Sequence, residues 1–333
     1  MTGRSGIPAS RTTKPYEGCL LLNKNPGQTS FESLFPVKKA FATGKVCHTG
    51  TLDKFARGLL VVLAGPAVKL ASRFSGCDKR YRATVKFGEE TDTLDPEGAV
   101  IAAGPVPERA ALEHILPRFT GGIMQAPPLF SAVHVDGVRA YKLARSPSLR
   151  PAGDSAKLVM KERPVTIYSL ELLDWTPPLA ELEVRCSAGT YIRSLARDIA
   201  LALGSRAHLL SLTRTAVGGF SLDEALSVPG PEDAGQDISR AGSESELEPL
   251  RKALIPLTPE LFARLGISCL DIGEKEAAAV SHGGSLRFLE DRASEVPIPA
   301  PLISAALFYS GSLAALVEKR DGLWSYGYVA SGG

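Results

Sequence analysis

The chain has 333 residues, a net charge of +2, and 44% hydrophobic and 22% charged residues. This length suits two domains of ~150 residues each, and the composition is typical of a folded globular protein. No apolar run approaches the length of a membrane span, which excludes a membrane protein. The five cysteines are scattered and form no C-x-x-C pair, which argues against disulfides and a zinc site and favours a reducing, cytoplasmic setting.

Positive charge is concentrated in the first part of the chain. Residues 1–90 contain fifteen Lys and Arg against six Asp and Glu, an excess of nine, so the remaining residues carry a net charge of −7. A cationic half favours a polyanionic partner, for which nucleic acid is the obvious candidate. A solvated basic surface would have the same composition, so both interpretations stay open.

The first elements surround a polar segment. Residues 1–17 are basic, rich in Ser, Thr, Gly and Pro, and lack an apolar core, which predicts a disordered tail and not a secretory signal. A buried strand is predicted over 18–22 and a helix over 33–44. Between residues 45 and 58, Gly50-Thr51-Leu52-Asp53 is too polar for a buried strand and too rich in Gly and Thr for a helix, which predicts an ordered loop. Asp53 is the candidate catalytic group, and an ordinary turn in which Asp53 bonds its own backbone is the alternative.

Two strands and a helix are predicted next. A continuous apolar run over 59–64 predicts a strand buried on both faces, and residues 66–74 predict a helix that carries Lys69. Residues 79–87 alternate, with Tyr81 on an apolar face and Arg80 and Arg82 on a cationic face. From this pattern alone, Tyr81 is a core tyrosine.

The middle of the chain contains an acidic turn and a long irregular segment. Asp92 and Asp95 lie in the turn over 89–98, where they would either hold a metal ion or cap a loop. A helix is predicted over 107–119. Residues 121–145 form a segment of the kind that is either functional or disordered, and residues 146–157 are Ser/Pro/Gly-rich and exposed.

The last elements complete two predicted domains. Strands over 164–175 and 181–188 precede a helix that ends near Gly204 and carries Arg193 on its first turn, away from the apolar stripe. A surface arginine is one interpretation of Arg193. Residues 231–252 are acidic and predict an exposed linker, and residues 253–333 predict a small β-rich domain with a hairpin at Asp321-Gly322. Nucleotide-cofactor motifs of the G-x-G-x-x-G and G-x-x-x-x-G-K-[ST] types are absent.

A series of motifs, in order along roughly residues 18–222, resembles the TruB family, the tRNA pseudouridine-55 synthases. The motifs are Lys24 with Gly27, Thr29 and Ser30; Lys45 to His48 with Gly50 to Asp53; Asp78-Lys79-Arg80-Tyr81; Thr91 to Gly98; Gln125 to Ala132 with Gly137, Tyr141 and Arg145; Cys186 to Arg193; and Ala207 to Arg214. Departures from the family pattern are Asn25, Cys47, Lys54, Arg57, Pro66 and Val68, and none of them removes a candidate catalytic group.

The resemblance implies a role for each candidate residue. Asp53 would be the single catalytic aspartate, Tyr81 would stack on the flipped uracil, and Arg193 would pair with Asp53. The remaining substrate-binding candidates are His48, which would hold the extruded nucleotide, and Lys69 and Leu212 in the pocket wall. The weaker candidates for RNA contact are Lys24, Arg57, Arg80, Arg82 and Arg145.

The resemblance also implies a fold. It predicts an α+β pseudouridine synthase domain over 18–230, with a central mixed, largely antiparallel sheet flanked by helices and loops. An RNA-gripping insertion would lie at about 121–157, and the domain at 253–333 would be PUA-like by analogy of position.

The implied activity is isomerisation of uridine 55 in the T-loop of tRNA. The N1–C1′ bond breaks, the uracil turns, and it is rejoined through C5, so nothing is oxidised and neither a cofactor nor a metal is required. The expected partner is the T-arm of tRNA, bound by a monomer and without a membrane. The alternatives are a non-catalytic RNA-binding protein of the same fold and the catalytic subunit of a guide-RNA particle, and the long insertion favours the stand-alone enzyme.

Overall fold

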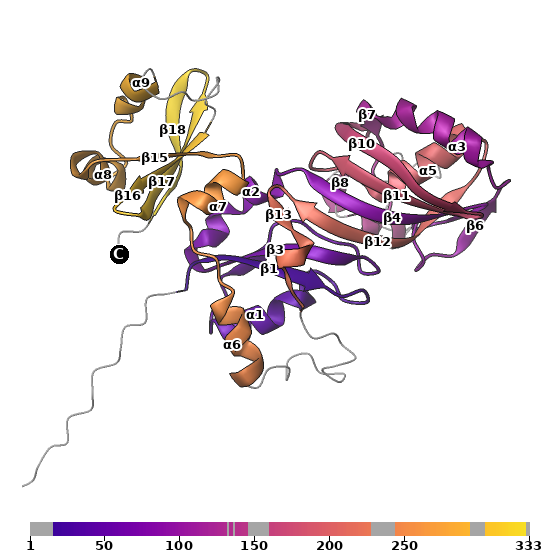
Figure 1. The fold of residues 1–333 in the computed structure, drawn as a ribbon, viewed down its shortest axis with the longest axis horizontal. Coiled ribbons are helices and arrows are strands. Elements are labelled where there is room, and N and C mark those ends of the chain that lie inside the picture. Colours follow the sequence, from indigo (N-terminus) through magenta and orange to yellow (C-terminus); the bar gives the residue numbers. More distant parts are fainter. Residues whose placement is uncertain are drawn as a thin grey trace, which may run out of the picture.

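The fold is built on one large sheet with a smaller sheet beside it (Figure 1). The computed structural model describes residues 16–131, 133–135, 137–145, 160–227, 244–293 and 304–330. The strands of the large sheet are β1 (Gly18–Lys24), β2 (Val46–His48), β3 (Arg57–Ala64), β4 (Lys79–Phe87), β7 (Gly121–Gln125), β10 (Arg163–Thr176), β11 (Leu179–Cys186), β12 (Ala207–Val217), β13 (Phe220–Ser221) and β14 (Leu226–Ser227).

The large sheet is mixed and mostly antiparallel. Its strands follow the order β14-β1-β3-β12-β4-β11-β10-β7, with β2 paired to β3 and β13 paired to β12. Only the β1–β14 and β3–β12 pairs are parallel. Two short hairpins, β5 (Glu89–Thr91) with β6 (Val100–Ala103) and β8 (His134–Val135) with β9 (Val138–Arg139), lie outside it. The predicted α+β class with a central mixed, largely antiparallel sheet is confirmed.

One half of the sheet is covered by helices α5 (Ile192–Ala202), α3 (Arg109–Ile115) and η3 (Leu116–Phe119). The apolar face of β4 packs here, because its side chains alternate between buried and exposed along the strand as the sequence predicts. Leu195 and Ile199 of α5 meet Leu182 and Leu209 of the sheet in this core. The cationic face of β4 is left on the other side.

The other half of the sheet is buried on both faces. Every residue of β3 after Arg57 is buried, as the continuous apolar run predicts. One face packs against η1 (Glu32–Leu34), α1 (Phe35–Ala40) and α6 (Glu244–Lys252). The opposite face packs against η2 (Gly65–Leu70), α2 (Ala71–Ser75) and α7 (Pro259–Arg264). The helix predicted over 33–44 is shorter in the structure. It begins as the 3₁₀ turn η1 and continues as α1, which ends at Ala40.

The C-terminal part is a four-stranded sheet with two helices. Its members are β15 (Ser268–Asp271), α8 (Glu274–Ser281), α9 (Phe288–Ala293), β16 (Ser304–Tyr309), β17 (Ser312–Arg320) and β18 (Leu323–Val329). The strand order is β15-β16-β17-β18, and β17 and β18 form the hairpin predicted at Asp321-Gly322. Helices α8 and α9 lie on the outer side of this sheet in Figure 1.

This C-terminal part packs against the large sheet. Phe262 of α7 and Phe308 of β16 share one apolar cluster with Phe74 and Phe220. Arg73 of α2 forms an ion pair with Glu318 of β17, and a backbone bridge joins β1 to Ile255. A continuous apolar core therefore links the two parts of the chain.

The prediction of an exposed linker over 231–252 is wrong for its last nine residues. Residues 244–252 form α6, where Leu247 and Leu250 are buried against α1 and the guanidinium of Arg251 donates to the carbonyl oxygen of Ala40 at 2.7 Å. The acidic composition hid an amphipathic helix whose leucines face the core. Residues 228–243, like the predicted tail at 1–15 and the segment 146–159, lie outside the described residues. Within the described parts of the chain, no helix is long and apolar enough to cross a membrane.

Replacing Phe262 tests whether the two parts of the chain are coupled. Phe262→Ala should lower the free energy of unfolding by about 3–5 kcal/mol, because it leaves a cavity in the shared cluster. Leu323→Ala is the control, since that side chain is 71% exposed and its loss should change stability by less than about 0.5 kcal/mol. Urea unfolding monitored by fluorescence measures both values. Equal effects of the two substitutions would contradict the shared core.

Candidate active site

Asp53 lies in the loop between β2 and β3, and the N-terminal segment holds this loop from one side. The hydroxyl of Ser30 accepts from the backbone N–H of Leu52 at 2.8 Å and donates to the carbonyl of Leu52 at 3.1 Å. The ammonium of Lys24 donates to the carbonyl oxygens of Gln28 at 2.7 Å and of Lys54 at 3.3 Å. The residues on either side of Asp53 are thereby fixed to the end of β1.

Arg214 of β12 holds the same loop from the other side. Its buried guanidinium donates to the carbonyl oxygens of Leu59 at 2.8 Å and of Gly50 at 3.0 Å. Gly58 allows the backbone of Arg214 to lie close to the end of the loop. It has a φ of +108°, and a Cβ there would lie 2.4 Å from the carbonyl oxygen of Arg214. Both ends of the loop are therefore attached to strands of the large sheet.

Arg193, the second residue of α5, is the partner of Asp53. One terminal nitrogen donates to Asp53 Oδ1 at 2.9 Å and to the carbonyl oxygen of Phe130 at 3.0 Å. The other donates to Asp95 Oδ2 at 3.2 Å and to the carbonyl oxygen of Thr93 at 2.8 Å. The Arg193 side chain is 4% exposed and that of Asp95 is 7% exposed, so a buried cation lies between two carboxylates.

Asp53 opens into a cavity of about 300 Å³. The aromatic and aliphatic part of the wall includes Tyr81 of β4, Leu212 of β12 and Tyr191 at the start of α5, and Ser, Thr, Lys and Arg side chains line much of the rest. The side chain of Gln125 fixes Tyr191 by bonding its backbone N–H at 2.8 Å and its carbonyl oxygen at 3.1 Å. The volume is at the lower end of the range for small-ligand sites, and the arrangement offers one carboxylate beside a flat apolar wall.

The surroundings set the charge of this carboxylate. Burial in the cavity raises the pKa of Asp53 above its usual range, Arg193 opposes this by stabilising the anion, and Asp95 raises the pKa further. The protein limits hydration of the carboxyl group although 34% of the side-chain surface stays accessible from the cavity. Burial also raises the pKa of Tyr81, so its hydroxyl is protonated at neutral pH.

The structure brings together four of the six strongest sequence-predicted candidates. Asp53, Tyr81, Arg193 and Leu212 all line the one cavity. Arg193 is buried, so its interpretation as a surface arginine is wrong. The position of Arg193 away from the apolar stripe of α5 suggested exposure to solvent. Its side chain instead extends from the first turn of α5 to the Asp53 loop.

His48 and Lys69 do not line this cavity. His48 is half-buried in β2, its Nδ1 has no hydrogen-bond partner among the described residues, and burial lowers its pKa. Lys69 is exposed on η2, which buries Ala67 and Leu70 instead. The Lys69 ammonium lies 6.0 Å from the ring centre of Tyr328 in the C-terminal sheet. The prediction that Lys69 lies in the pocket wall is therefore wrong.

The five candidates for RNA contact separate into different environments. Lys24 is fully buried among backbone carbonyls, and this burial lowers its pKa to about 8, so the prediction that it contacts RNA is wrong. Arg57, Arg80 and Arg82 are exposed, and Arg82 is paired with Glu183 at 3.4 Å. Arg145 ends α4 (Ala140–Arg145), and its side chain lies outside what the structure describes.

Sequence reasoning missed several residues that build the site. Asp95 is a second partner of Arg193, although the acidic turn suggested only a metal ligand or a cap. Sequence reasoning placed the buried Arg214 and Gln125 only within family motifs and gave neither a role. The sequence did carry a signal for Asp95 and Gln125, because both are polar residues of family motifs at the edge of a strand. Asp95 lies in the turn between β5 and β6, and Gln125 is the last residue of β7. Within the described residues, no group of three or more His, Cys, Asp or Glu is placed to hold a metal ion.

Comparison with known proteins agrees with this geometry. Residues 38–192 match the family described as TruB family pseudouridylate synthase, N-terminal domain. The tRNA pseudouridine synthase B of Borreliella burgdorferi strain ZS7 is 47% identical over 211 residues, which are 62% of this chain and 72% of that protein. The protein of the same name from Bordetella avium strain 197N is 45% identical over 66% of this chain and 88% of that protein. The chain belongs to the TruB family.

Solved structures extend the similarity of this TruB family member to the C-terminal part. A Cbf5-Nop10-Gar1 complex contains a chain with 25% identity and a TM-score of 0.63, over 95% of this chain and 84% of that one. An H/ACA RNP bound to a substrate RNA containing 2′-deoxyuridine contains a chain with 22% identity and a TM-score of 0.61, over 93% and 83%. The overall fold, including the predicted pseudouridine synthase architecture, is confirmed.

Substitutions of Asp95 and Arg193 should shift the pH dependence of activity in opposite directions. We expect Asp53 to react in its ionised form, so its raised pKa predicts that kcat/KM falls at a higher pH than for an ordinary aspartate. Asp95→Asn should move this acid limb to lower pH, because it removes a neighbouring negative charge. Arg193→Gln should move it to higher pH, because it removes the stabilising cation. Measured pH profiles of kcat/KM that shift in the same direction would contradict this electrostatic model.

Proposed function

We propose that this chain is a stand-alone tRNA pseudouridine synthase that converts uridine 55 in the T-loop into pseudouridine. The observation that carries the proposal is the ion pair of Asp53 with the buried Arg193 in the wall of a cavity that Tyr81 and Tyr191 also line. A single carboxylate beside a wall that can stack on a base fits glycosidic chemistry on an extruded uridine. Relatives at 45–47% identity that are named tRNA pseudouridine synthase B support tRNA as the substrate.

The cavity requires the target base to leave its stack. A uridine within folded RNA has its C1′, C5 and C6 covered by neighbours, so it must be extruded before a side chain can reach them. Tyr81 and Leu212 provide flat and apolar surfaces that replace the lost stacking. The protonated Tyr81 hydroxyl adds no negative charge near Asp53.

The ionised Asp53 supplies the reacting oxygen. It can attack C1′, attack C6 of the uracil, or accept the C2′ proton, and each route detaches N1 from C1′. The uracil then turns and forms the C5–C1′ bond, N1 gains a proton, and the C5 proton leaves to solvent, so the product is an isomer of the substrate. Asp95 is bound to Arg193 behind the cavity, which leaves Asp53 as the reacting carboxylate. Uracil is a better leaving group than a sugar alcohol, so a second carboxylate acting as general acid is not needed.

The insertion predicted at about 121–157 favours an enzyme that binds tRNA by itself. Ser131 lines the cavity, and Gln125 fixes Tyr191, so the first part of the insertion, from the end of β7 to Ser131, borders the site. A cationic first domain would attract the T-arm. We include in the proposal a monomeric, cytoplasmic enzyme whose C-terminal part also binds RNA.

A catalytic subunit of a ribonucleoprotein is the second candidate. It is favoured by the fold match over 95% of the chain to a protein from a Cbf5-Nop10-Gar1 complex. The 45–47% identity to proteins named for tRNA favours the stand-alone enzyme. The two candidates differ in one requirement, because the ribonucleoprotein subunit would need other components for activity.

Substitution of Asp53 tests the proposal directly. The pure protein should release tritium from a T-arm minihelix labelled at C5 of its uridines, without other factors. Asp53→Asn should lower the rate by roughly 10³-fold or more, because it removes the reacting carboxylate while preserving its shape. Asp92→Asn is the control, since Asp92 is an exposed carboxylate of the neighbouring turn and its loss should leave the rate near that of the wild type.

Each result has a defined meaning. An inactive wild type that gains activity only with a guide RNA and partner proteins would support the second candidate. A wild type that binds the minihelix but never releases tritium would support a non-catalytic RNA-binding protein. Undiminished release by Asp53→Asn would remove Asp53 from the chemistry.

A further inference from the structure

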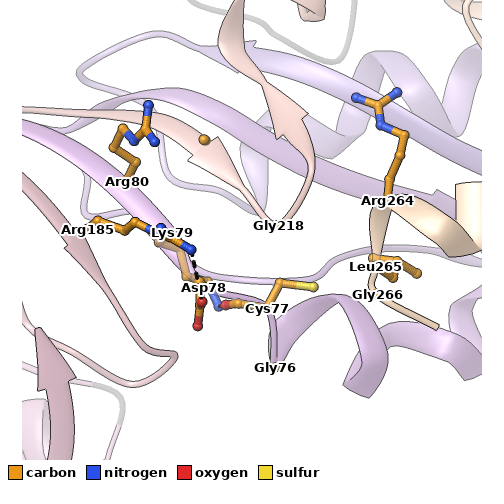
Figure 2. A pocket seen from close by; sticks show the side chains of 11 residues that line it. Gly76, Cys77, Asp78, Lys79, Arg80, Arg185, Gly218, Arg264, Leu265 and Gly266 are labelled. Carbon is orange, nitrogen blue, oxygen red and sulfur yellow. Dashed lines mark hydrogen bonds and ion pairs between the residues drawn. The ribbon is translucent and has the colours of Figure 1, made fainter. Parts of the chain in front are cut away.

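A second cavity, of about 380 Å³, lies beside the active site where β4 begins. It is bordered by the connection from α2 to β4, by β11, and by the residues that follow α7 (Figure 2). The side chains that carry charge here are Lys79, Arg80, Arg185 and Arg264, with Asp78 as the one carboxylate among the lining residues. Arg264 is paired with Glu224 next to the cavity, so the positive character of the cavity comes from Lys79, Arg80 and Arg185 against Asp78.

Two of these cations face each other across neighbouring strands. Arg80 of β4 and Arg185 of β11 are directly paired in register, and like charges in this position destabilise a sheet. Asp78 lies 4.0 Å from Arg185, whereas the guanidinium of Arg80 has no ion pair within the described parts of the chain. The fold therefore holds two exposed guanidinium groups together without enough negative charge to neutralise them.

The other two cations form a fixed frame. The ammonium of Lys79 donates to the carbonyl oxygens of Ser75 at 2.5 Å and of Cys77 at 2.6 Å. Arg264 lies over the ring of Phe220, 4.2 Å from its centre, donates to the carbonyl oxygen of Gly219 at 3.1 Å, and is neutralised by an ion pair with Glu224 at 2.5 Å. Figure 2 shows Arg264 on the opposite side of the cavity from Arg80 and Arg185. Residues from both parts of the chain thus enclose one positively charged space.

This cavity adjoins the one that contains Asp53. Lys79, the first residue of β4, lines both cavities. The alternation of β4 directs Tyr81 to the catalytic cavity and Arg80 to the basic one. An RNA that inserts a base beside Tyr81 would bring its backbone close to Arg80 and Arg185.

We propose that the basic cavity binds a phosphodiester group of the same RNA that inserts its uridine into the catalytic cavity. Guanidinium groups match the oxygens of a phosphate with paired hydrogen bonds and remain charged. One phosphate would relieve the repulsion between Arg80 and Arg185, and the cavity has room for it. This assignment rests on the proposed function and adds a second anchor point for the substrate.

The test compares two double variants with equal loss of charge. Arg80→Gln/Arg185→Gln removes the two exposed cations of the cavity. Arg109→Gln/Arg118→Gln removes two exposed arginines from α3 and η3, outside both cavities. Affinity for the T-arm minihelix is measured from 50 to 300 mM KCl, and tritium release is measured at saturating RNA.

The cavity variant should bind roughly tenfold more weakly at low salt, and the slope of log K against log salt should decrease by about one. Its rate at saturating RNA should match the wild type, because the catalytic cavity is intact. Arg80→Lys/Arg185→Lys should recover most of the salt slope but less of the affinity, because it keeps charge without the paired geometry. A thermal melt of each variant establishes that it is folded, and relief of the Arg80–Arg185 repulsion should leave the melting temperature unchanged or higher.

Four outcomes are decisive. Equal binding and equal slopes for the two double variants would overturn the proposal, even where the wild type is an active synthase. Inorganic phosphate, tested at constant ionic strength, should compete with the minihelix for the wild type and not for the cavity variant. If phosphate instead binds the cavity while the cavity variant keeps full RNA affinity, the cavity holds a free anion and the RNA assignment is wrong. Absence of tritium release by the wild type would overturn the proposed function and leave the binding comparison as the test of the cavity.

Discussion

The buried guanidinium of Arg193 is the constraint on which the active site depends. Removing an arginine from water is costly unless its charge and its N–H groups are satisfied. Here two carboxylates and two backbone carbonyls bind its two terminal nitrogens, while Nε has no partner among the described residues. These partners come from the Asp53 loop, the acidic turn and the insertion. Because one buried cation binds all three segments, displacing any of them removes a hydrogen bond or an ion pair from Arg193.

The same constraint decides how Asp53 can act. A carboxylate beside an apolar cavity tends to take up a proton, and a carboxylate paired with a cation tends to lose it. Arg193 shares its charge between Asp53 and Asp95, so it opposes the effect of burial without abolishing it. The pKa of Asp53 therefore reflects a balance in which burial and Asp95 raise it and Arg193 lowers it. Lys24 and Arg214 hold the loop by its carbonyl oxygens and leave the carboxylate itself to Arg193 and the substrate.

Sequence reasoning succeeded where periodicity controls the structure. The continuous apolar run of β3 and the alternation of β4 each have one arrangement that buries their apolar residues, so the strands and the position of Tyr81 could be predicted. The resemblance predicted the pairing of Arg193 with Asp53 correctly. Sequence reasoning failed for Lys24, for α6 and for the interpretation of Arg193 as a surface arginine. Burial of Arg193 depends on acceptors as far as 140 residues away in the chain, and Lys24 has an acceptor 30 residues away beside the local carbonyl oxygen of Gln28. No local pattern records the distant acceptors. The acidic residues of α6 masked two leucines that face α1.

Register of β4 links the two cavities. Its pairing with β11 and β12 sets Arg80 against Arg185 and Tyr81 against Arg214. A shift of one residue would exchange the two faces, which would put an arginine into the stacking wall and a tyrosine among the cations. The buried Tyr81, Ala83, Val85 and Phe87 prevent such a shift, because they would all move to the exposed face. The core that stabilises this strand therefore also fixes where a base and a phosphate could bind, and the two functions cannot be separated by local rearrangement of β4.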